Sequence, residues 1–449
     1  MSAQTGNARA LVMAAPASGS GKTVLTLALL RAYARAGRKV ASAKAGPDYI
    51  DPRYHEAASG APCVNLDAWG MGEGTLFDLA GRQARGRDLL IIEGVMGLFD
   101  GAADGSGTTA DLAMTLDAPV VLVVDAAKQA QSVGALVRGF RDHRPGLTLA
   151  GVLLNRIGST RHEAMLRGAL EDIGVEVLGA VPRSQALSLP ERHLGLVQAG
   201  EHADLEGFLE AAADAVDAAL DLDRLAEVAR PLAKPAPSTL PRSERGHGLA
   251  PLGQRIAIAR DDAFAFAYPH LLDGWRRAGA ELTFFSPLAD EPPAEDADAI
   301  YLPGGYPELH AGRIAAARTF LSRLCMAARA RTRVYGECGG YMVLGEGLVD
   351  AEGARHAMAG LLPLETSFAS RKLHLGYRRL TPLGSVAPWA HPLSAHEFHY
   401  ASILREGTDG RETERLFAAT DAQGQYLGTI GLRAGTVMGS FAHVIAQAG

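Results

Sequence analysis

Residues 10–37 read ALVMAAPASGSGKTVLTLALLRAYARAG and combine an apolar run, a glycine-containing loop and a long amphipathic stretch. The run ALVMAA has the length and composition of a buried strand, and TVLTLALLRAYARAG predicts a helix that ends at Gly37. The loop between them, APASGSGKT, has the GKT ending of a phosphate-binding loop, with Pro16 where the strict motif has glycine. Because this loop follows a strand and opens a helix, we interpret it as a variant nucleotide-binding loop, with a chance glycine turn as the alternative.

Five consecutive residues of this loop offer the groups that hold a nucleotide. Backbone N–H groups of the first three can face phosphate oxygens, the lysine supplies a cation, and the threonine hydroxyl can bind Mg²⁺. These residues are Gly19, Ser20, Gly21, Lys22 and Thr23. The loop therefore predicts ATP and Mg²⁺ as cofactors.

Apolar runs alternate with amphipathic stretches as far as about residue 220. They are short, continuous and rich in Val, Ile and Leu, as is typical of parallel strands buried on both faces. The runs read ALVMAA, KVASAKA, DLLIIEGV, PVVLVVDA, LAGVLLN and VEVLGAVP. This pattern predicts a doubly wound α/β domain with a parallel sheet, followed by an alanine-rich helix over roughly residues 205–229.

A segment rich in Pro, Ser, Gly and charge then precedes a second alternation of strands and helices. The second alternation contains RIAIA, ELTFFSP, DAIYLPGG and RVYGE, and from about residue 360 it looks richer in antiparallel strands. We therefore predict an ATP-binding domain over residues 1–230, a linker over residues 231–253 and a second α/β domain over residues 254–449.

Length, charge and composition exclude several classes of protein. The 449 residues are too many for one core, and a net charge of −6 leaves no overall basic field for nucleic acid or an anionic membrane. No apolar run approaches the twenty or so residues of a transmembrane helix, and the N-terminus lacks the cationic region of a signal peptide. The three cysteines have no paired spacing, so we expect no disulfide framework and a reducing cytoplasm.

Polar residues stand at the ends of the second and third predicted strands, in ASAKAGPDYIDP and LLIIEGVMGLFDG. Loops that leave the carboxyl edge of a parallel sheet are where such folds bind ligands, and a glutamate that ends a buried strand is costly without a function. We expect Thr23, Asp48 and Glu93 to form an oxygen set for Mg²⁺, with Lys44 close by. Two further acidic residues stand in the same loops, namely Asp51 and Asp100.

Asn155 ends another predicted strand, in LLNRI. Its amide could hydrogen-bond a nucleotide base, and a capping role is the equally good alternative.

The segment VYGECGGYMVLG (334–345) predicts a strand, a sharp turn at Cys338 and a helix. A nucleophile at such an elbow is exposed above the sheet, and the helix N-terminus is expected to lower the thiol pKa. The alternative is a buried, inert cysteine, which we expect for Cys325 and Cys63.

A nucleophilic Cys338 needs oxyanion donors and a base. The N–H of Gly339, directly after the cysteine, can face an oxyanion, and the PGGYPE turn (303–308) offers Gly304 and Gly305 at another strand end. Near the C-terminus, GSFAHVIAQAG places His443 after a short strand, where it can act as the base.

These motifs carry a resemblance to a known family. PGGYPE, YGECGGYMVLGEGL and GSFAHV resemble the class I glutamine amidotransferase domain, and SGSGKT, KAGPDYIDP, IEGVMGLFDG and LLNR resemble the dethiobiotin synthetase-like ATP-binding fold. Their combination, with LPERHLGL, HLGYR and HEFHY, is similar to the cobyrinic acid or hydrogenobyrinic acid a,c-diamide synthase family. The resemblance covers nearly the whole chain.

The resemblance implies a ligase that uses glutamine as its nitrogen donor. Ammonia released at Cys338 and His443, with oxyanion donors at Gly305 and Gly339, would attack an acyl phosphate formed with ATP on the a and c acetate groups of a corrinoid acid. We take Tyr49 and Asp100, with Lys44 and Asp48, as candidates for contact with that substrate. The resemblance also implies a homodimer.

The sequence departs from the amidotransferase pattern in one respect. Ordinary class I enzymes have a glutamate two residues after the catalytic histidine, and this chain has Ile445 there, so a Cys–His dyad is the expected form. In HEFH, His396 and His399 would point to opposite faces of a strand, so we do not expect them to share a metal.

Three other interpretations remain open at this point. One is a cobyric acid synthase or another tetrapyrrole diamide synthase with the same chemistry. Another is a partitioning or metal-insertion ATPase that works as a nucleotide switch. The third is an amidotransferase domain that has lost catalysis, against which the intact Cys338 and His443 argue.

Overall fold

The protein is described by a computed structural model over residues 9–184, 187–189, 191–192, 195–196, 198–232, 248–384, 387–407 and 413–448. The chain forms two compact units, Met1–Arg245 and Gly246–Gly449. Most of the predicted linker lies outside the described residues, so its bounds stay a prediction. Three residues of the LPERHLGL segment, at positions 190, 193 and 194, also lie outside them.

The first unit is built on a parallel sheet in the order β3-β2-β4-β1-β5-β6-β7, and β10 pairs antiparallel with β1. All six predicted strands are present, and β3 is a seventh that the sequence pattern did not reveal because CVNL is short. The strands are β1 (Arg9–Ala14), β2 (Val40–Ala45), β3 (Cys63–Leu66), β4 (Leu89–Glu93), β5 (Val120–Asp125), β6 (Leu149–Ile157), β7 (Val177–Pro182) and β10 (Arg230–Pro231), with a small hairpin of β8 (Glu191–Arg192) and β9 (Gly195–Leu196).

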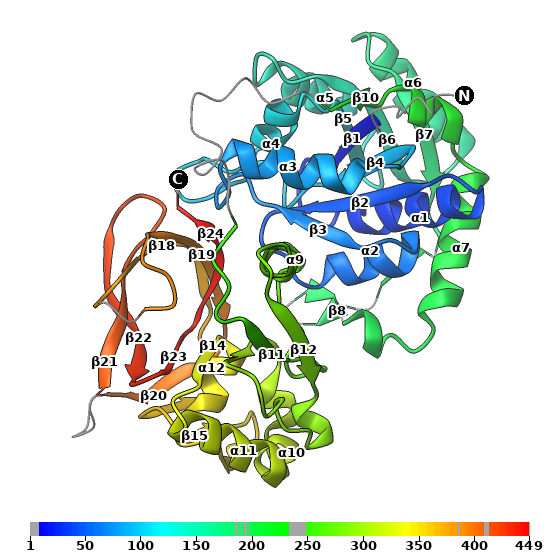
Figure 1. Cartoon of the computed structure of the whole chain (residues 1–449). Helices are drawn as coiled ribbons and strands as arrows, with labels where there is room; N and C mark the ends of the chain where they lie inside the picture. Colours follow the sequence, from blue (N-terminus) through cyan, green and yellow to red (C-terminus); the bar gives the residue numbers. More distant parts are fainter. Residues whose placement is uncertain are drawn as a thin grey trace, which may run out of the picture. The chain divides into compact units, whose positions relative to one another are not determined.

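The helices of the first unit connect these strands (Figure 1). They are α1 (Lys22–Arg35), α2 (Asp51–Ser59), α3 (Glu73–Ala84), α4 (Thr109–Leu116), α5 (Ser132–Asp142), α6 (Thr160–Glu171), α7 (Leu205–Asp217) and α8 (Leu222–Glu227). The single helix expected over residues 205–229 is broken, because Asp221 leaves the helical conformation and accepts a hydrogen bond from the N–H of Arg224, which starts α8.

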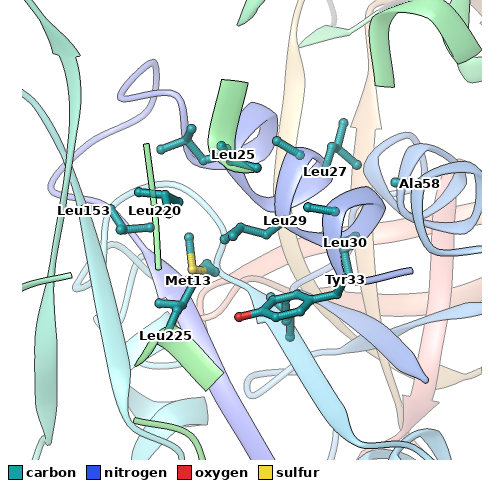
Figure 2. Close-up of a cluster of buried hydrophobic side chains, with 14 of the residues drawn as sticks. Met13, Leu25, Leu27, Leu29, Leu30, Tyr33, Ala58, Leu153, Leu220 and Leu225 are labelled. Atoms are coloured by element: carbon teal, nitrogen blue, oxygen red, sulfur yellow. The ribbon is translucent and has the colours of Figure 1, made fainter. Parts of the chain in front are cut away.

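The core of the first unit joins α1, α2, α7 and α8 to one face of the sheet. Figure 2 shows Leu25 and Leu29 of α1 close to Met13 of β1 and Leu153 of β6. Alternate positions on the strands, such as Ile92, are also fully buried, so both faces of the sheet are covered. Burial on both faces explains why these strands read as continuous apolar runs.

The second unit contains a mixed sheet in the order β12-β11-β13-β14-β23-β22-β21-β18-β19-β24. Pairing is parallel from β12 to β23 and antiparallel from β23 to β24, as the strand-rich last third predicted. The strands are β11 (Arg255–Ala259), β12 (Glu281–Phe285), β13 (Ala299–Leu302), β14 (Arg333–Glu337), β18 (His374–Pro382), β19 (Leu393–His399), β21 (Thr413–Thr420), β22 (Tyr426–Ala434), β23 (Val437–Ser440) and β24 (Ala442–Gln447).

A smaller sheet, four α-helices and two short 3-10 helices complete the described part of the second unit. The sheet has the order β16-β15-β17-β20, from β15 (Gly347–Val349), β16 (Arg355–Ala357), β17 (Leu364–Ser367) and β20 (Ser402–Glu406). The α-helices are α9 (Pro269–Arg277), α10 (Ala311–Ala316), α11 (Arg318–Arg329) and α12 (Gly339–Leu344). Among the described residues, no helix is long and apolar enough to cross a membrane.

Candidate active sites

The phosphate loop of the first unit joins β1 to α1 in the conformation that its glycines allow. Gly19 and Gly21 have φ angles of 80° and 88°, a region that favours glycine. Gly21 is the N-cap of α1, and no side chain caps that helix. The backbone N–H groups at the start of α1 are thus available to an anion such as phosphate.

Asn155 and Arg156, at the end of β6, hold this loop from the neighbouring strand. Asn155 Nδ2 donates a hydrogen bond to the Ser20 carbonyl (2.9 Å), and Arg156 donates to the Gly19 carbonyl (3.0 Å) and to Asp125 (2.5 Å). A Cβ at Gly21 would lie only 2.1 Å from Asn155 Nδ2. The Asn155 amide is therefore part of the loop's support, and its contact with a base stays a prediction.

Lys22 is buried at the start of α1, with its ammonium aimed at a second loop. Its Nζ donates to the Met96 carbonyl (3.0 Å) in the segment after β4. Burial, and then the neighbouring Lys44 ammonium, lower the pKa of Lys22 to about 8. A partly desolvated lysine at this place gains an anionic partner when phosphate binds.

Oxygen atoms from α1, α2 and β4 converge on the Lys44 ammonium. Thr23 Oγ1 donates to Glu93 Oε1 (2.6 Å) and lies 3.5 Å from Asp51 Oδ2. Lys44 Nζ donates to Asp51 Oδ2 (2.5 Å) and to Glu93 Oε1 (2.8 Å), and its side chain is 3% exposed. The strand ends thus assemble a hydroxyl, two carboxylates and an ammonium beside the phosphate loop.

The predicted carboxylate Asp48 has a different contact from the one expected. Its Oδ1 accepts the N–H groups of Ile50 and Asp51 (2.8 and 3.0 Å) and so supports the start of α2. Asp51, three residues further along the same loop, is the carboxylate within hydrogen-bonding distance of Thr23 and Lys44. Sequence spacing could not separate the two, because the turn into α2 decides which side chain points inward.

His55 is a second group that the sequence did not reveal. It lies in α2, is fully buried, and its Nε2 is 2.6 Å from Glu93 Oε2, while Cys63 Sγ lies 3.6 Å from its Nδ1. Both oxygens of Glu93 are therefore engaged, one by His55 and the other by Thr23 and Lys44. Cys63 is buried as expected, and its inert role stays a prediction.

The charges in this cluster stabilise one another. Although burial raises the pKa of Glu93, the Lys44 ammonium and His55 hold it well below its usual range. Burial opposes the charge on Lys44, but Asp51 and Glu93 raise the pKa of that ammonium above its usual value. Burial and the nearby Asp48 raise the pKa of Asp51 to about 6. At neutral pH the cluster holds a charged lysine against charged carboxylates.

The remaining predicted contacts of the first unit lie on loops of the same sheet edge. Asp100 accepts the N–H of Gly97 (2.8 Å) and thereby closes the turn after β4. Tyr49 is partly buried in the loop between β2 and α2. Their contact with a substrate stays a prediction.

In the second unit, Cys338 occupies the predicted elbow between β14 and α12 (Figure 1). Its φ and ψ angles are 47° and −105°, a strained conformation for a residue with a side chain. The backbone is held there by hydrogen bonds from the Cys338 N–H to Ser440 (2.8 Å) and from the Gly340 N–H to Pro303 (3.1 Å). A strained backbone conformation that the surrounding hydrogen bonds hold in place is typical of a functional turn.

Three glycines let the PGG turn and the elbow approach closely. A Cβ on Gly339 would lie 3.1 Å from the Gly305 backbone nitrogen, and one on Gly305 would lie 2.1 Å from the Ala263 carbonyl oxygen. A Cβ on Gly304 would lie 2.2 Å from His443 Cε1 and 3.2 Å from Cys338 Cβ. The predicted oxyanion donors, nucleophile and base are thus brought together by residues that lack side chains.

His443 stands on β24, which pairs with β19 so that His443 is opposite His396. The side chain is almost fully buried, at 1% exposure. Burial, together with the neighbouring His396 and His399, lowers the pKa of His443 to about 3. The imidazole is therefore neutral at physiological pH and can accept a proton.

The expectation of a lowered thiol pKa is wrong for the free protein. Burial raises the pKa of Cys338 well above its usual value, and the carboxylates of Glu308, Glu397 and Glu337 raise it further. The Gly339 N–H lowers it, but α12 has only six residues and does not offset the loss of solvent. Cys338 rests as a thiol beside a neutral imidazole.

HEFH forms the end of β19, beside the nucleophile. The Phe398 carbonyl lies 4.0 Å from Cys338 Sγ. His399 stacks on His374 with ring centroids 4.7 Å apart and has Glu397 3.0 Å from its Nε2, and His396 does not belong to this group. One ligand atom from each of His374, Glu397 and His399 lies within 4.8 Å of the others, but Arg378 already pairs with Glu397 (2.7 Å). These contacts fit a packed polar cluster better than a cation site.

Both units match known protein families. Residues 11–197 match the CobQ/CobB/MinD/ParA nucleotide binding domain, and residues 255–449 match the CobB/CobQ-like glutamine amidotransferase domain. A relative from Brucella anthropi called hydrogenobyrinate a,c-diamide synthase is 61% identical over 97% of this chain and 98% of its own length. Relatives of the same name from a Sinorhizobium species and Rhodobacter capsulatus are 57% and 53% identical, each over 98% of this chain and 99% of their own.

The chain belongs to the hydrogenobyrinate a,c-diamide synthase family. Membership in this family confirms the resemblance noted from the motifs and the predicted fold class. It also decides against a nucleotide switch of the partitioning type, because that interpretation accounts only for the nucleotide-binding domain and leaves the amidotransferase domain without a role.

Position 445, where ordinary class I amidotransferases have glutamate, is buried in this chain. In this member of the hydrogenobyrinate a,c-diamide synthase family, Ile445 is fully buried on β24, and its carbonyl accepts a hydrogen bond from His270 (2.8 Å). A carboxyl group near His443 comes instead from Glu337, whose Oε2 lies 3.9 Å from His443 Nδ1. The sequence did not reveal this neighbour, although Glu337 directly precedes Cys338, because the histidine lies far along the chain.

Proposed function

We propose that this protein uses ATP and glutamine to convert the a and c acetate carboxyl groups of hydrogenobyrinic acid into amides, a step of cobalamin biosynthesis. The observation that carries the proposal is the near full-length identity to relatives of that name. Two sites of different chemistry support it, a phosphate loop beside a buried charge cluster and a cysteine elbow beside a neutral histidine.

In the proposed glutaminase reaction, Cys338 attacks the side-chain amide of glutamine. The thiol proton passes to neutral His443 as the S–C bond forms, since neither group is charged beforehand. Backbone N–H groups of Gly305 and Gly339 hold the oxyanion, and the imidazolium protonates the departing ammonia. Water then hydrolyses the glutamyl thioester, returning the thiol.

In the proposed synthetase reaction, the loop residues Gly19 to Thr23 hold the ATP phosphates, and Lys22 supplies a positive charge at their oxygens. A substrate carboxylate oxygen attacks the γ-phosphorus of ATP, the bond to the β-phosphate oxygen breaks, and ADP and an acyl phosphate form. Ammonia attacks its carbonyl carbon, the C–O bond to phosphate breaks, and an amide remains. Lys44 keeps the acidic side chains in place and adds charge at the phosphate side of the loop.

The acidic cluster fits Mg²⁺, which prefers a few hard oxygen ligands together with water and phosphate oxygens. We propose that the Thr23 hydroxyl and Glu93 hold it, with Asp51 as the further carboxylate and Asp48 contributing only through the oxygen not used at the start of α2. When bound, Mg²⁺ neutralises charge on the ATP phosphates. Lys44 Nζ donates to the same two carboxylates, Asp51 and Glu93.

The direct test supplies Mg-ATP, glutamine labelled with ¹⁵N at its amide, and hydrogenobyrinic acid, and reads the product by mass spectrometry. The expected product carries two labelled amides. Cys338→Ala should lose the reaction with glutamine and keep it with ammonium salts, while Lys22→Met should lose both. Amidation of cobyrinic acid but not of hydrogenobyrinic acid would change the substrate, and product without label would refute transfer from glutamine.

We also propose that the enzyme works in the cytoplasm as a homodimer. The free thiols of the chain agree with a reducing compartment. Light scattering of the purified protein gives its molar mass directly, and a value of one chain at working concentration would refute the dimer.

A further inference from the structure

We propose that Glu337, the residue directly before the nucleophile, is the acidic partner of His443 and takes the place of the glutamate that this chain lacks at position 445. This inference rests on the proposed glutaminase function. Glu337 would be a positioning residue, because it acts through the imidazole and does not itself contact the thiol.

The Glu337 side chain is held in one orientation. It is 1% exposed, its Oε1 accepts the Val444 N–H (3.1 Å), and its Oε2 accepts the Tyr301 hydroxyl (2.8 Å). The same Oε2 lies 3.9 Å from His443 Nδ1. Because Val444 directly follows His443, the carboxyl group is hydrogen-bonded to β24 next to the histidine.

The PGG turn lies against both the imidazole and the nucleophile. The empty Cβ position of Gly304 lies 2.2 Å from His443 Cε1, 3.1 Å from His443 Nε2 and 3.2 Å from Cys338 Cβ. The carboxyl group thus lies on the Nδ1 side of the ring, while the PGG turn lies against its Cε1 and Nε2 atoms and against the cysteine. This is the order of groups in an acid–histidine–nucleophile triad.

The elbow makes this arrangement possible. β14 and β23 pair in parallel with Glu337 opposite Ser440, and β24 begins two residues later at Ala442. The sharp turn at Cys338 sends consecutive side chains in different directions, so that Glu337 stays with the sheet while Cys338 leaves it. A carboxyl group from β14 can therefore reach the histidine that other amidotransferases approach from the histidine's own strand.

An acid at Nδ1 has a defined effect on the ring. When the carboxylate accepts the Nδ1–H, the lone pair is left on Nε2, where the thiol proton has to go. After that transfer, the carboxylate faces an imidazolium and stabilises its charge. The present distance of 3.9 Å is longer than a hydrogen bond, and such contacts commonly shorten when substrate binds.

Glu337 differs from an ordinary buried structural carboxyl group in its surroundings. Tyr301 faces it from the neighbouring strand β13, Tyr335 stands two residues before it on β14, and among the described residues no Lys or Arg forms an ion pair with it. Burial raises its pKa to about 7, against the hydrogen bonds from Tyr301 and Val444. The carboxylate form of Glu337 is therefore unfavourable in the resting protein, and a positive charge on His443 would stabilise it during catalysis.

The decisive variant is Glu337→Gln, which keeps the size of the side chain and its ability to accept the Val444 N–H. We expect kcat for glutamine hydrolysis to fall by about tenfold to a hundredfold with KM changed by less than about twofold. Ammonium-dependent amidation and the stoichiometry of Cys338 labelling by a diazo-ketone analogue of glutamine should stay at the wild-type level. Glu406→Gln is the matched control, since Glu406 also accepts a tyrosine hydroxyl (2.7 Å, from Tyr341) in the same unit.

Tyr301→Phe is a second variant, which keeps the acid and removes one hydrogen-bond donor to it. The Glu337 pKa should then rise further, so the acidic limb of kcat should move to higher pH. Other groups that face the catalytic pair are His396, His399, Glu397 and Glu308, and none of them is altered by this change.

Two outcomes would overturn the proposal. One is a kcat of Glu337→Gln equal to that of the Glu406→Gln control. The other is a combination of two results: Glu337→Gln loses both Cys338 labelling and thermal stability, and Tyr301→Phe leaves the pH profile of kcat unchanged. Together these results would show that Glu337 has a purely structural role. Failure of the proposed function would look different, because the wild type would not hydrolyse glutamine or Cys338→Ala would still do so.

Discussion

Substitution of Gly304 by alanine should disable the glutaminase while leaving the synthetase intact. The added Cβ would lie 2.2 Å from His443 Cε1, whereas ordinary van der Waals contact begins at 3.4 Å, so one partner must move by 1.2 Å. His443 and Cys338 are buried, and the turn itself is anchored by the Phe266 N–H on the Gly304 carbonyl (2.9 Å). The histidine must therefore leave its place beside the cysteine.

A misplacement of about 1 Å in a catalytic group costs on the order of 10²-fold in rate, or about 2.7 kcal/mol of barrier. The assay compares kcat/KM for glutamine hydrolysis with ammonium-dependent amidation in the same preparation. We expect the first to fall by about that factor and the second to remain, because the synthetase residues belong to the other unit.

Gly274→Ala is the matched control. Gly274 lies inside α9, and the atom nearest to an added Cβ would be Arg277 Nη2 at 3.8 Å. Alanine is favoured over glycine in a helix interior by up to about 1 kcal/mol. This variant should hydrolyse glutamine normally. If Gly304→Ala does so as well, the close approach of the PGG turn, the cysteine and the histidine is not the catalytic arrangement, and the assignment of His443 fails.

Three further predictions concern pH and metal. Because the pKa of Lys22 is lowered to about 8, its ammonium is charged below that pH and neutral above it, so the affinity of the free protein for ATP should fall as pH rises through about 8. Lys22→Arg, measured by the same ATP titration, should lose this dependence, and an unchanged profile would contradict the assignment. Because burial raises the pKa of the Cys338 thiol, its alkylation by iodoacetamide in the absence of glutamine should be slow at neutral pH and still increase above pH 9, and a plateau below pH 7 would contradict this. Removal of Mg²⁺ by a chelator should stop amidation with either nitrogen donor and leave glutamine hydrolysis in place, and Glu93→Gln should require more Mg²⁺ for half-maximal amidation; an unchanged Mg²⁺ requirement would move the metal away from Glu93.

Local motifs determined much about this protein from the sequence alone. The phosphate loop and the cysteine elbow are each formed by a strand, a turn and a helix in consecutive residues. Both contain glycine where a positive φ angle or a close contact requires it, and these glycines can be read directly from the sequence. Buried parallel strands also leave a continuous apolar signal, so the first sheet could be predicted except for the short β3. The same motifs were specific enough to indicate the family.

Contacts between distant residues were decided only by the tertiary structure. Asp51 rather than Asp48 reaches Lys44 because of how the chain turns into α2, and Glu337 meets Val444 across 107 residues. The raised pKa of Cys338 follows from burial, from Glu308 and Glu397 on other segments and from the adjacent Glu337, which together outweigh the short helix behind it. Distance and desolvation depend on the whole fold, and they set the charges with which both sites start their reactions.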